Sequence, residues 1–322
     1  MSDERLRELL EVQAHFRLPS VALVEKDLHV VQAIAALTTF DAAPFRLVFG
    51  GGTALARAHR LVRRMSEDVD FKVVPLAAAP VSRSALRRQL DQLRHRVSTE
   101  LQSAGFTFDA ADKSVAWARD EGRYAVWQLP YRGGTGAGEG LRPAIKVELN
   151  YAPLRQPTVT LPVRSFVAEA LNRPSEVVGI ACVSVVQTAA EKLVSLTRRT
   201  AMEMAGASRD PDPTLVRHIY DLHMMRESVD PATVADLARA IAAADAQEFA
   251  SQYPAYAADI AGETHKAMDA LCSNPLHRER YARFMADMVY GERPEFGAAI
   301  ATVAAAVERW LRASDAVSVG AG

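Results

Sequence analysis

Long apolar runs are missing from this sequence. No stretch approaches the roughly 18 consecutive apolar residues that a membrane-spanning helix needs. The amino terminus, Met1-Ser2-Asp3-Glu4-Arg5, carries charges of both signs, which is not the pattern of a signal peptide. We therefore expect a cytoplasmic protein with no membrane association.

Cysteine is also scarce. The chain has only Cys182 and Cys272, which stand in apolar or mixed surroundings without the spacing of metal ligands. Buried thiols are therefore expected rather than a disulfide or a zinc site.

Net charge is nearly absent, at -1, and this argues against indiscriminate nucleic-acid binding. The distribution is less even. Between Thr53 and Arg96 the acids Glu67, Asp68, Asp70 and Asp91 are outnumbered by basic residues: Arg57, Arg60, Arg63, Arg64, Lys72, Arg83, Arg87, Arg88, Arg94 and Arg96. This cluster could follow a nucleic-acid backbone. For Arg83–Arg96, a solvated helix face explains the pattern equally well.

The composition that remains is that of an ordinary globular protein, with 49% hydrophobic and 24% charged residues. Its pattern predicts α/β structure first and helices afterwards. Helices are expected over 3–16, 20–39 and 82–103, and strands over 45–50, 68–76, 114–118, 123–129 and 144–151. From about residue 174 the period becomes helical, with Ser184 as a helix cap and a further helix starting near Pro213 and Thr214. The glycine-rich segment 133–140 is expected to be a mobile loop, or one that closes over substrate.

The most informative segment joins a glycine turn to two carboxylates. Leu47-Val48-Phe49 fits a buried strand that ends in Gly50-Gly51-Gly52, and Thr53 is predicted to cap the helix that follows. Glycines allow a polyphosphate to approach the backbone closely. Asp68 and Asp70 are two positions apart, so on a strand they point to the same face. Their mutual repulsion and hard oxygen atoms suit magnesium and substrate phosphates.

A third carboxylate lies on a later strand. The alternation of Ile145-Lys146-Val147-Glu148-Leu149-Asn150 places Lys146, Glu148 and Asn150 on one face. Glu148 could bind metal or accept the proton of the attacking hydroxyl. An exposed glutamate or an ion pair with Lys146 are the open alternatives.

These motifs resemble the AbiEii/AbiGii family of nucleotidyltransferase-like toxins, a branch of the polymerase-beta-type superfamily that includes the mycobacterial MenT toxins. The resemblance rests on five segments in the family's order over roughly residues 20 to 230. They are Val24-Glu25-Lys26-Asp27, Gly51-Gly52-Thr53, Ser66-Glu67-Asp68-Val69-Asp70, Thr188-Ala189-Ala190-Glu191-Lys192-Leu193 and Arg217-His218-Ile219-Tyr220-Asp221-Leu222.

The resemblance implies a nucleotidyltransferase fold of the α/β (α+β) class. It would have a mixed-sheet catalytic domain over 1–173, a helical domain over 174–316 that contributes Lys192 and Asp221 to the site, and a flexible tail over 317–322. The implied catalytic set is Ser66, Asp68, Asp70, Glu148, Lys192 and Asp221. Magnesium, with two ions expected, would be bound by Asp68, Asp70 and Glu148. The NTP would contact Gly51, Gly52, Thr53, Ser66 and Lys192.

The implied function is transfer of a nucleotide to a hydroxyl, foremost that of the tRNA 3′ acceptor end, by a toxin that has a cognate antitoxin. A nucleotidyltransferase acting on a small molecule or a protein, and a non-catalytic nucleotide- or partner-binding module, are the alternatives. One departure is His218, where relatives commonly carry an acid, and it puts the orientation of its neighbours in doubt. The sequence does not fix the nucleotide, the tRNA, the oligomeric state or the antitoxin's mechanism.

Overall fold

The computed structural model describes the chain except for residues 1, 78–80, 132, 136–141, 208–211 and 319–322. Two compact units make up the chain. The first contains Met1–Arg60 and Arg64–Val183, and the second contains Leu61–Arg63 and Ser184–Gly322.

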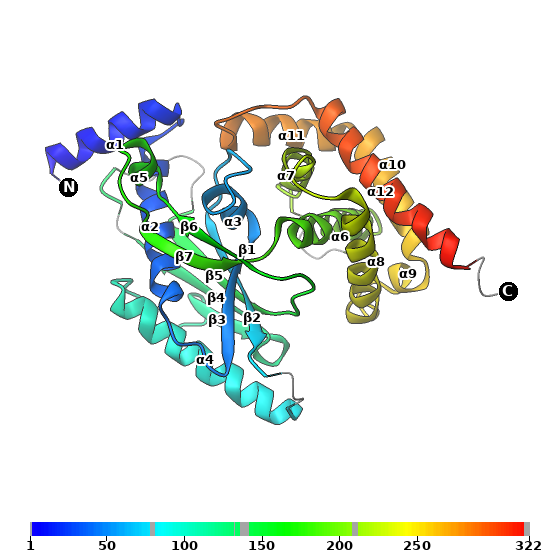
Figure 1. Ribbon diagram of the computed structural model, residues 1–322, viewed down its shortest axis with the longest axis horizontal. Coiled ribbons are helices and arrows are strands. Elements are labelled where there is room, and N and C mark those ends of the chain that lie inside the picture. The colour runs from blue at the N-terminus through cyan, green and yellow to red at the C-terminus, as the bar shows by residue number, and fades with distance from the viewer. Residues whose placement is uncertain (1, 78–80, 132, 136–141, 208–211, 319–322) are drawn as a thin grey trace. The chain divides into compact units, whose positions relative to one another are not determined.

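A mixed seven-stranded sheet is the centre of the first unit (Figure 1). The strand order is β3-β4-β5-β2-β1-β7-β6. β2 is antiparallel to β1 and parallel to β5, so β2, the first strand after the glycine turn, lies in the middle of the sheet. The bounds are β1 Phe45–Gly50, β2 Asp68–Pro75, β3 Ala116–Arg119, β4 Tyr124–Pro130, β5 Ala144–Tyr151, β6 Val159–Val163 and β7 Val177–Cys182.

One face of this sheet is apolar and packs against helices. Phe71 of β2, Trp127 of β4 and Val147 of β5 join buried residues of α2 and α4 in a single core cluster. Since side chains alternate along a strand, Asp68, Asp70 and Lys72 point to the opposite face. The helical elements of this unit are α1 Asp3–Phe16, α2 Val21–Thr38, α3 Gly51–Arg57, α4 Arg83–Ser103, the 3₁₀ turn η1 Asp120–Gly122 and α5 Phe166–Ala170.

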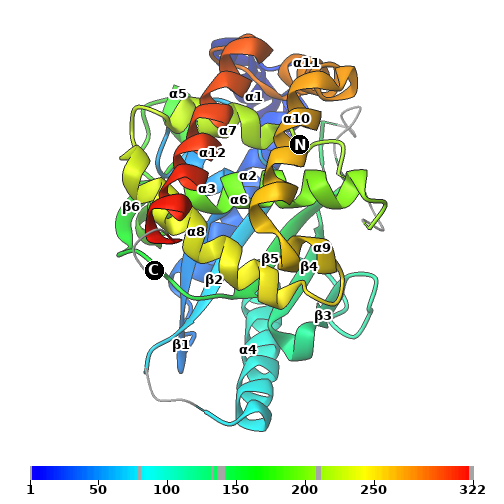
Figure 2. The ribbon, with the colours of Figure 1, turned by 90° about the vertical axis from the view of Figure 1, so that its right-hand side faces the viewer.

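The second unit is helical wherever it is described with regular structure (Figure 2). α6 packs against α7, α8 and α10, and α12 packs against α7 and α8. The bounds are α6 Val185–Met204, α7 Arg217–Met225, α8 Pro231–Glu248, α9 Pro254–Ala258, α10 Ile260–Ser273, α11 Pro275–Met288 and α12 Phe296–Ser318. Among the described residues, no helix is long and apolar enough to cross a membrane.

The predicted order of a mixed sheet followed by helices is confirmed, but three local predictions were wrong. The helical period expected from residue 174 overlooks β7, whose residues Val177–Cys182 lie between β1 and the edge strand β6. Thr53 does not cap α3, because Gly50 is the cap and makes no side-chain hydrogen bond. α7 begins at Arg217, after a turn over 213–216. Ser184 does cap α6, with its side chain accepting from the backbone N–H of Gln187.

Both cysteines are free thiols, as expected, although only Cys182 is buried and Cys272 is exposed. Cys182 ends β7 inside the apolar core cluster, and burial raises the pKa of its thiol to about 12. The glycine-rich segment predicted to form a loop lies largely outside the described residues, as do the last four residues of the predicted tail.

Candidate active site

The glycine turn lies directly against the first carboxylate strand. Gly51 has a φ of +71°, and a Cβ placed there would lie 1.9 Å from Oδ2 of Asp70. Backbone pairing of Gly50 with Asp70 fixes this approach. Glycine is required at position 51 both by its left-handed backbone and by the absence of space for a methyl group.

We predict that Gly51→Ala lowers the free energy of unfolding by about 2–3 kcal/mol, because backbone strain and a clash with Asp70 add together. Gly206→Ala is the matched control, since Gly206 has a φ of +65° but no atom within 4 Å of its Cβ position. That variant is expected to lose only about 1 kcal/mol, from backbone strain alone. Equal losses in urea denaturation of the two variants would contradict the proposed contact with Asp70.

The next two residues of the turn have different neighbours. A Cβ at Gly52 would lie 2.9 Å from the hydroxyl of Ser66 and 2.4 Å from a guanidinium nitrogen of Arg64. Ser66 therefore lies beside the turn, and Arg64 is a cation there that the motif did not indicate. Thr53 is buried, and its hydroxyl donates to the backbone carbonyl of Asp68. Its observed contact ties α3 to the start of β2.

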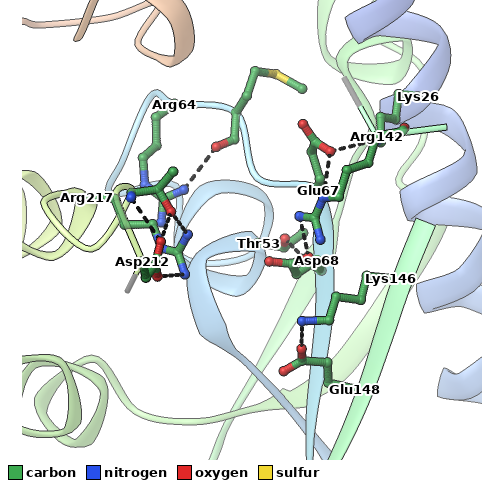
Figure 3. Close-up of polar contacts among 12 residues, drawn as sticks. Lys26, Thr53, Arg64, Glu67, Asp68, Arg142, Lys146, Glu148, Asp212 and Arg217 are labelled. Atoms are coloured by element: carbon green, nitrogen blue, oxygen red, sulfur yellow. Dashed lines mark hydrogen bonds and ion pairs between the residues drawn. The ribbon is translucent and has the colours of Figure 1, made fainter. Parts of the chain in front are cut away.

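Asp68, Asp70 and Glu148 lie on the face of the sheet opposite to the core cluster with α2 and α4. Figure 3 shows Asp68 and Glu148 with their ion-pair partners. Asp70 stands directly opposite Glu148 in the parallel pairing of β2 with β5, and Asp68 stands opposite Lys146. In the structure, however, Glu148 forms an ion pair with Lys146, and Asp68 pairs with Nη2 of Arg142 at 2.8 Å. Of the described residues, no three acidic, histidine or cysteine side chains form a group that could hold one metal ion.

Tyr124 of β4 completes the surroundings of Glu148. Its hydroxyl hydrogen-bonds to Glu148, and burial together with this carboxylate raises the pKa of the phenol. The phenol therefore stays protonated and can donate to Glu148. No sequence motif indicates Tyr124, and the pairing of β4 with β5 brings it to the site.

Glu67, between Ser66 and Asp68, points to a different cluster. Its carboxylate accepts from Nζ of Lys26 at 2.5 Å and lies 3.4 Å from Nε of Arg142. Lys26 also donates to the backbone carbonyl of Arg142 at 2.7 Å. Burial lowers the pKa of Lys26, although Glu67 opposes that effect. Lys26 thus connects α2 to the residue before Asp68 and to the start of the segment leading into β5 (Figure 3).

The neighbouring Asp27 anchors the same helix to α3. Its carboxylate binds Nε of Arg57 at 2.7 Å and accepts from the backbone N–H of Phe166 at 2.6 Å. Arg57 also lies over the ring of Phe166, 3.5 Å from its centroid. Asp27 therefore holds the helix that follows the glycine turn, and Lys26 holds the residue before the strand that carries Asp68.

The second unit has its own buried polar cluster. Nζ of Lys192 on α6 lies 2.9 Å from Oδ2 of Asp221 and 3.2 Å from Nδ1 of His218, both on α7. Asp221 is fully buried and Lys192 is 7% exposed. The helical pattern predicted Lys192 on a face apart from the apolar stripe, and α7 buries that position by supplying two polar partners.

His218 can accept a hydrogen bond in this cluster because it is neutral. Burial, followed by the charges of Lys192 and Arg217, lowers its pKa well below the usual 6.5, while Asp221 opposes the shift. Since Lys192 is the donor, Nδ1 is the unprotonated nitrogen. His218 therefore supplies an acceptor to Lys192 at the position where the family resemblance implies an acid.

We predict that His218 makes the protein less stable in mild acid. The unfolded chain binds a proton near pH 6.5 and the folded chain does not, so stability is kept above pH 6.5 and lost as the pH falls toward the folded pKa. His218→Asn, which retains an acceptor oxygen, should reduce the slope of unfolding free energy between pH 6.5 and 5 by up to about 1.4 kcal/mol per pH unit. Urea denaturation at several pH values tests this. At pH 8 the histidine is neutral in both the folded and the unfolded chain, so any difference in stability between the two proteins there comes from packing. An unchanged slope would show that His218 is protonated in the folded protein.

Comparison with known proteins adds the family. The family model for the nucleotidyl transferase AbiEii toxin of type IV toxin–antitoxin systems matches residues 35–311. No curated protein matches the chain. Among solved structures, MenT4, a nucleotidyltransferase toxin from Mycobacterium tuberculosis H37Rv, is similar at 18% identity, with 94% of this chain and 88% of that chain covered and a TM-score of 0.47. The family match includes the glycine turn, the carboxylate strand, Lys192 and Asp221, and on this ground the chain belongs to the AbiEii family of nucleotidyltransferase toxins.

Proposed function

We propose that the protein transfers a nucleoside monophosphate from an NTP to the 3′ hydroxyl of tRNA, which would block aminoacylation and growth. The observation that supports this most is the close approach of Gly51 to Asp70. A glycine turn that a triphosphate can approach then lies next to a carboxylate that could bind a metal ion. A triphosphate and a divalent cation need these two features side by side.

Magnesium fits this donor set. Magnesium is usually held by one or two carboxylates plus substrate phosphates, so a group of three protein ligands is not needed. Asp68 and Asp70 would hold it, and Glu148 is the neighbouring carboxylate from β5. When bound, magnesium would stabilise negative charge on the phosphates during displacement.

The chain's own residues would bind the triphosphate and accept the proton of the attacking hydroxyl. The acceptor oxygen would form a bond to the α-phosphorus as the bond from that phosphorus to its bridging oxygen breaks, and pyrophosphate would leave. Glu148 is proposed to accept the hydroxyl proton, directly or through water, after leaving its ion pair with Lys146. The Gly51-Gly52-Thr53 turn and Ser66 are proposed to hold the triphosphate, with the Arg64 guanidinium beside Gly52 adding positive charge.

Two further roles come from the family resemblance. Lys192 is proposed to bind the triphosphate, and Asp221 to place the attacking hydroxyl. Both are held within the second unit by their mutual ion pair and by His218. An antitoxin is the expected protein partner, since the family is defined as a toxin–antitoxin system.

The acceptor is tested by incubating the protein with magnesium, each of the four α-labelled NTPs in turn, and total tRNA. A second tRNA sample is oxidised with periodate, which destroys the terminal 3′ hydroxyl while leaving the rest of the RNA intact. Label on untreated tRNA but not on oxidised tRNA is the expected result and names the nucleotide. Equal labelling of both would place the acceptor elsewhere on the RNA, and no labelling of either would overturn the tRNA proposal in favour of a small-molecule or protein acceptor.

A further inference from the structure

Strand pairing lines up an aromatic side chain with the carboxylates on the face of the sheet opposite to α2 and α4. Trp117 of β3 pairs with Val126 of β4, Val126 with Glu148 of β5, and Glu148 with Asp70 of β2. The adjacent row is formed in the same way by Arg119, Tyr124, Asn150 and Lys72. Neighbouring strands are about 4.8 Å apart, so the backbone of Trp117 lies roughly 10 Å from that of Glu148.

Trp117, Arg119 and Tyr124 adjoin one another at this edge of the sheet, with the two ring planes inclined by 52°, and are called the platform below. The rings of Trp117 and Tyr124 are 5.6 Å apart between centroids, and the guanidinium carbon of Arg119 lies 4.2 Å from the centroid of Tyr124. Arg119 is exposed, and it makes no ion pair within the described part of the chain. Tyr124 links the platform to the site through its hydrogen bond to Glu148.

Two hollows lie between β3 and α4, on the side of the edge strand opposite to the platform, and both include basic residues in their walls. One has a volume of about 710 Å³ and includes Arg94, Lys113 and Trp117 in its wall. The other, of about 360 Å³, includes Arg87, Arg88 and Arg119. The acids of the smaller hollow have partners of their own, since Asp91 pairs with Arg94 and Glu121 with Arg83. Arg87, Arg88 and Arg119 therefore leave that hollow positively charged.

Because β3 is the edge strand, the platform and the hollows adjoin around that edge, and together they have the composition of a single-strand binding surface. Unpaired bases stack on aromatic rings and guanidinium planes, whereas phosphates bind to nearby basic residues. A duplex keeps its bases stacked internally and cannot use the platform in this way.

We propose that Trp117, Arg119 and Tyr124 stack against unpaired bases at the 3′ end of an acceptor RNA. The RNA backbone would continue around edge strand β3, where the two hollows on the α4 side would take its phosphates. This inference rests on the proposed transfer to an RNA hydroxyl and names the surface that positions the RNA. The register places the platform beside Glu148, so RNA held on β3 and β4 can direct its terminal hydroxyl toward the carboxylates.

Tryptophan fluorescence gives a direct test that needs no catalysis. Of the chain's three tryptophans, Trp127 and Trp310 are buried and Trp117 is partly exposed. A six-nucleotide single-stranded RNA with a free 3′ hydroxyl, added without NTP, should quench the fluorescence of the wild-type protein. Trp117→Phe should abolish the quenching but bind RNA within about threefold of wild type, while Trp117→Ala should weaken binding about 5- to 100-fold, as expected for loss of base stacking.

Arg119→Ala tests the charge in the same assay. It should weaken binding and lower the dependence of log affinity on log salt by about one unit, the effect of losing one phosphate contact. Arg283→Ala is the control, because Arg283 is an exposed arginine of α11 that pairs only with Glu279 among the described residues. Melting temperatures of all variants show whether a loss of binding instead reflects damage to the edge strand β3.

The outcomes separate this inference from the proposed function. If wild type labels RNA but Trp117→Ala and Arg119→Ala keep both the wild-type affinity and the wild-type KM for RNA, the platform is wrong and the function stands. If blunt duplex RNA quenches Trp117 and binds as tightly as the single strand, the assignment to unpaired bases is overturned. If no NTP labels RNA, the proposed acceptor fails, whereas the quenching result still decides whether the platform binds single strands.

Discussion

Asp68→Asn/Asp70→Asn is expected to lower nucleotide transfer at least about 1000-fold while the chain remains folded. The substitution removes two negative charges that we propose to hold magnesium, and stabilisation of transition-state charge by a metal is worth several kcal/mol. The initial rate of transfer from an α-labelled NTP, at saturating magnesium, measures the loss.

The free energy of unfolding of this double variant should rise or stay unchanged. Asp68 and Asp70 share one face of β2, so replacing both removes their repulsion, and the ion pair that is lost joins Asp68 to the half-exposed Arg142. The rise in melting temperature given by magnesium with a non-hydrolysable NTP analogue should disappear in the double variant. Glu279→Gln, an exposed acid on α11, is the control and should behave as wild type. A double variant that still transfers nucleotide at more than a tenth of the wild-type rate would contradict the assignment.

Lys192→Met is expected to destabilise the protein by about 3–5 kcal/mol, because it removes the ammonium partner of the fully buried Asp221. Lys192→Met/Asp221→Leu should recover much of that loss, since no buried carboxylate is then left without the ammonium. Urea denaturation of the wild type, both single variants and the double variant gives the coupling energy between the two positions.

The control is Arg283→Met, which breaks an exposed ion pair with Glu279 and should change stability by less than about 0.5 kcal/mol. Activity of the double variant separates structure from chemistry. If stability recovers and transfer does not, Lys192 or Asp221 acts in the reaction as proposed. If both recover, the pair is only a structural element of the second unit.

Local patterns in the sequence were sufficient to predict the centre of the sheet. The alternation in 68–76 and 144–151 predicted β2 and β5 within one residue, and the pairing of Asp70 with Glu148 agrees with the predicted shared face. β7 was missed because Val177–Cys182 is apolar at most positions, and a short apolar run does not distinguish a buried strand from a helix.

The partners of charged residues were much harder to predict, because they depend on contacts distant in sequence. Lys26 forms an ion pair with Glu67 and donates to the backbone carbonyl of Arg142, and nothing in the spacing of these residues indicates these contacts. Tyr124 reaches Glu148 only through the register of β4 with β5. The Gly51–Asp70 contact was different, since both residues belong to a local pattern, a glycine turn followed by a strand with two carboxylates, that suits phosphate and metal binding.

The central claim is that a nucleotidyl group, and not a phosphoryl group, is transferred. Parallel reactions with the NTP labelled at the α- or the γ-phosphorus, in the presence of magnesium and tRNA, test it most directly. We predict that the α label appears on the acceptor in amounts equal to the pyrophosphate released, and that the γ label appears only in pyrophosphate. Transfer of the γ label to the acceptor, or release of γ-labelled inorganic phosphate without any α label on the acceptor, would contradict the account.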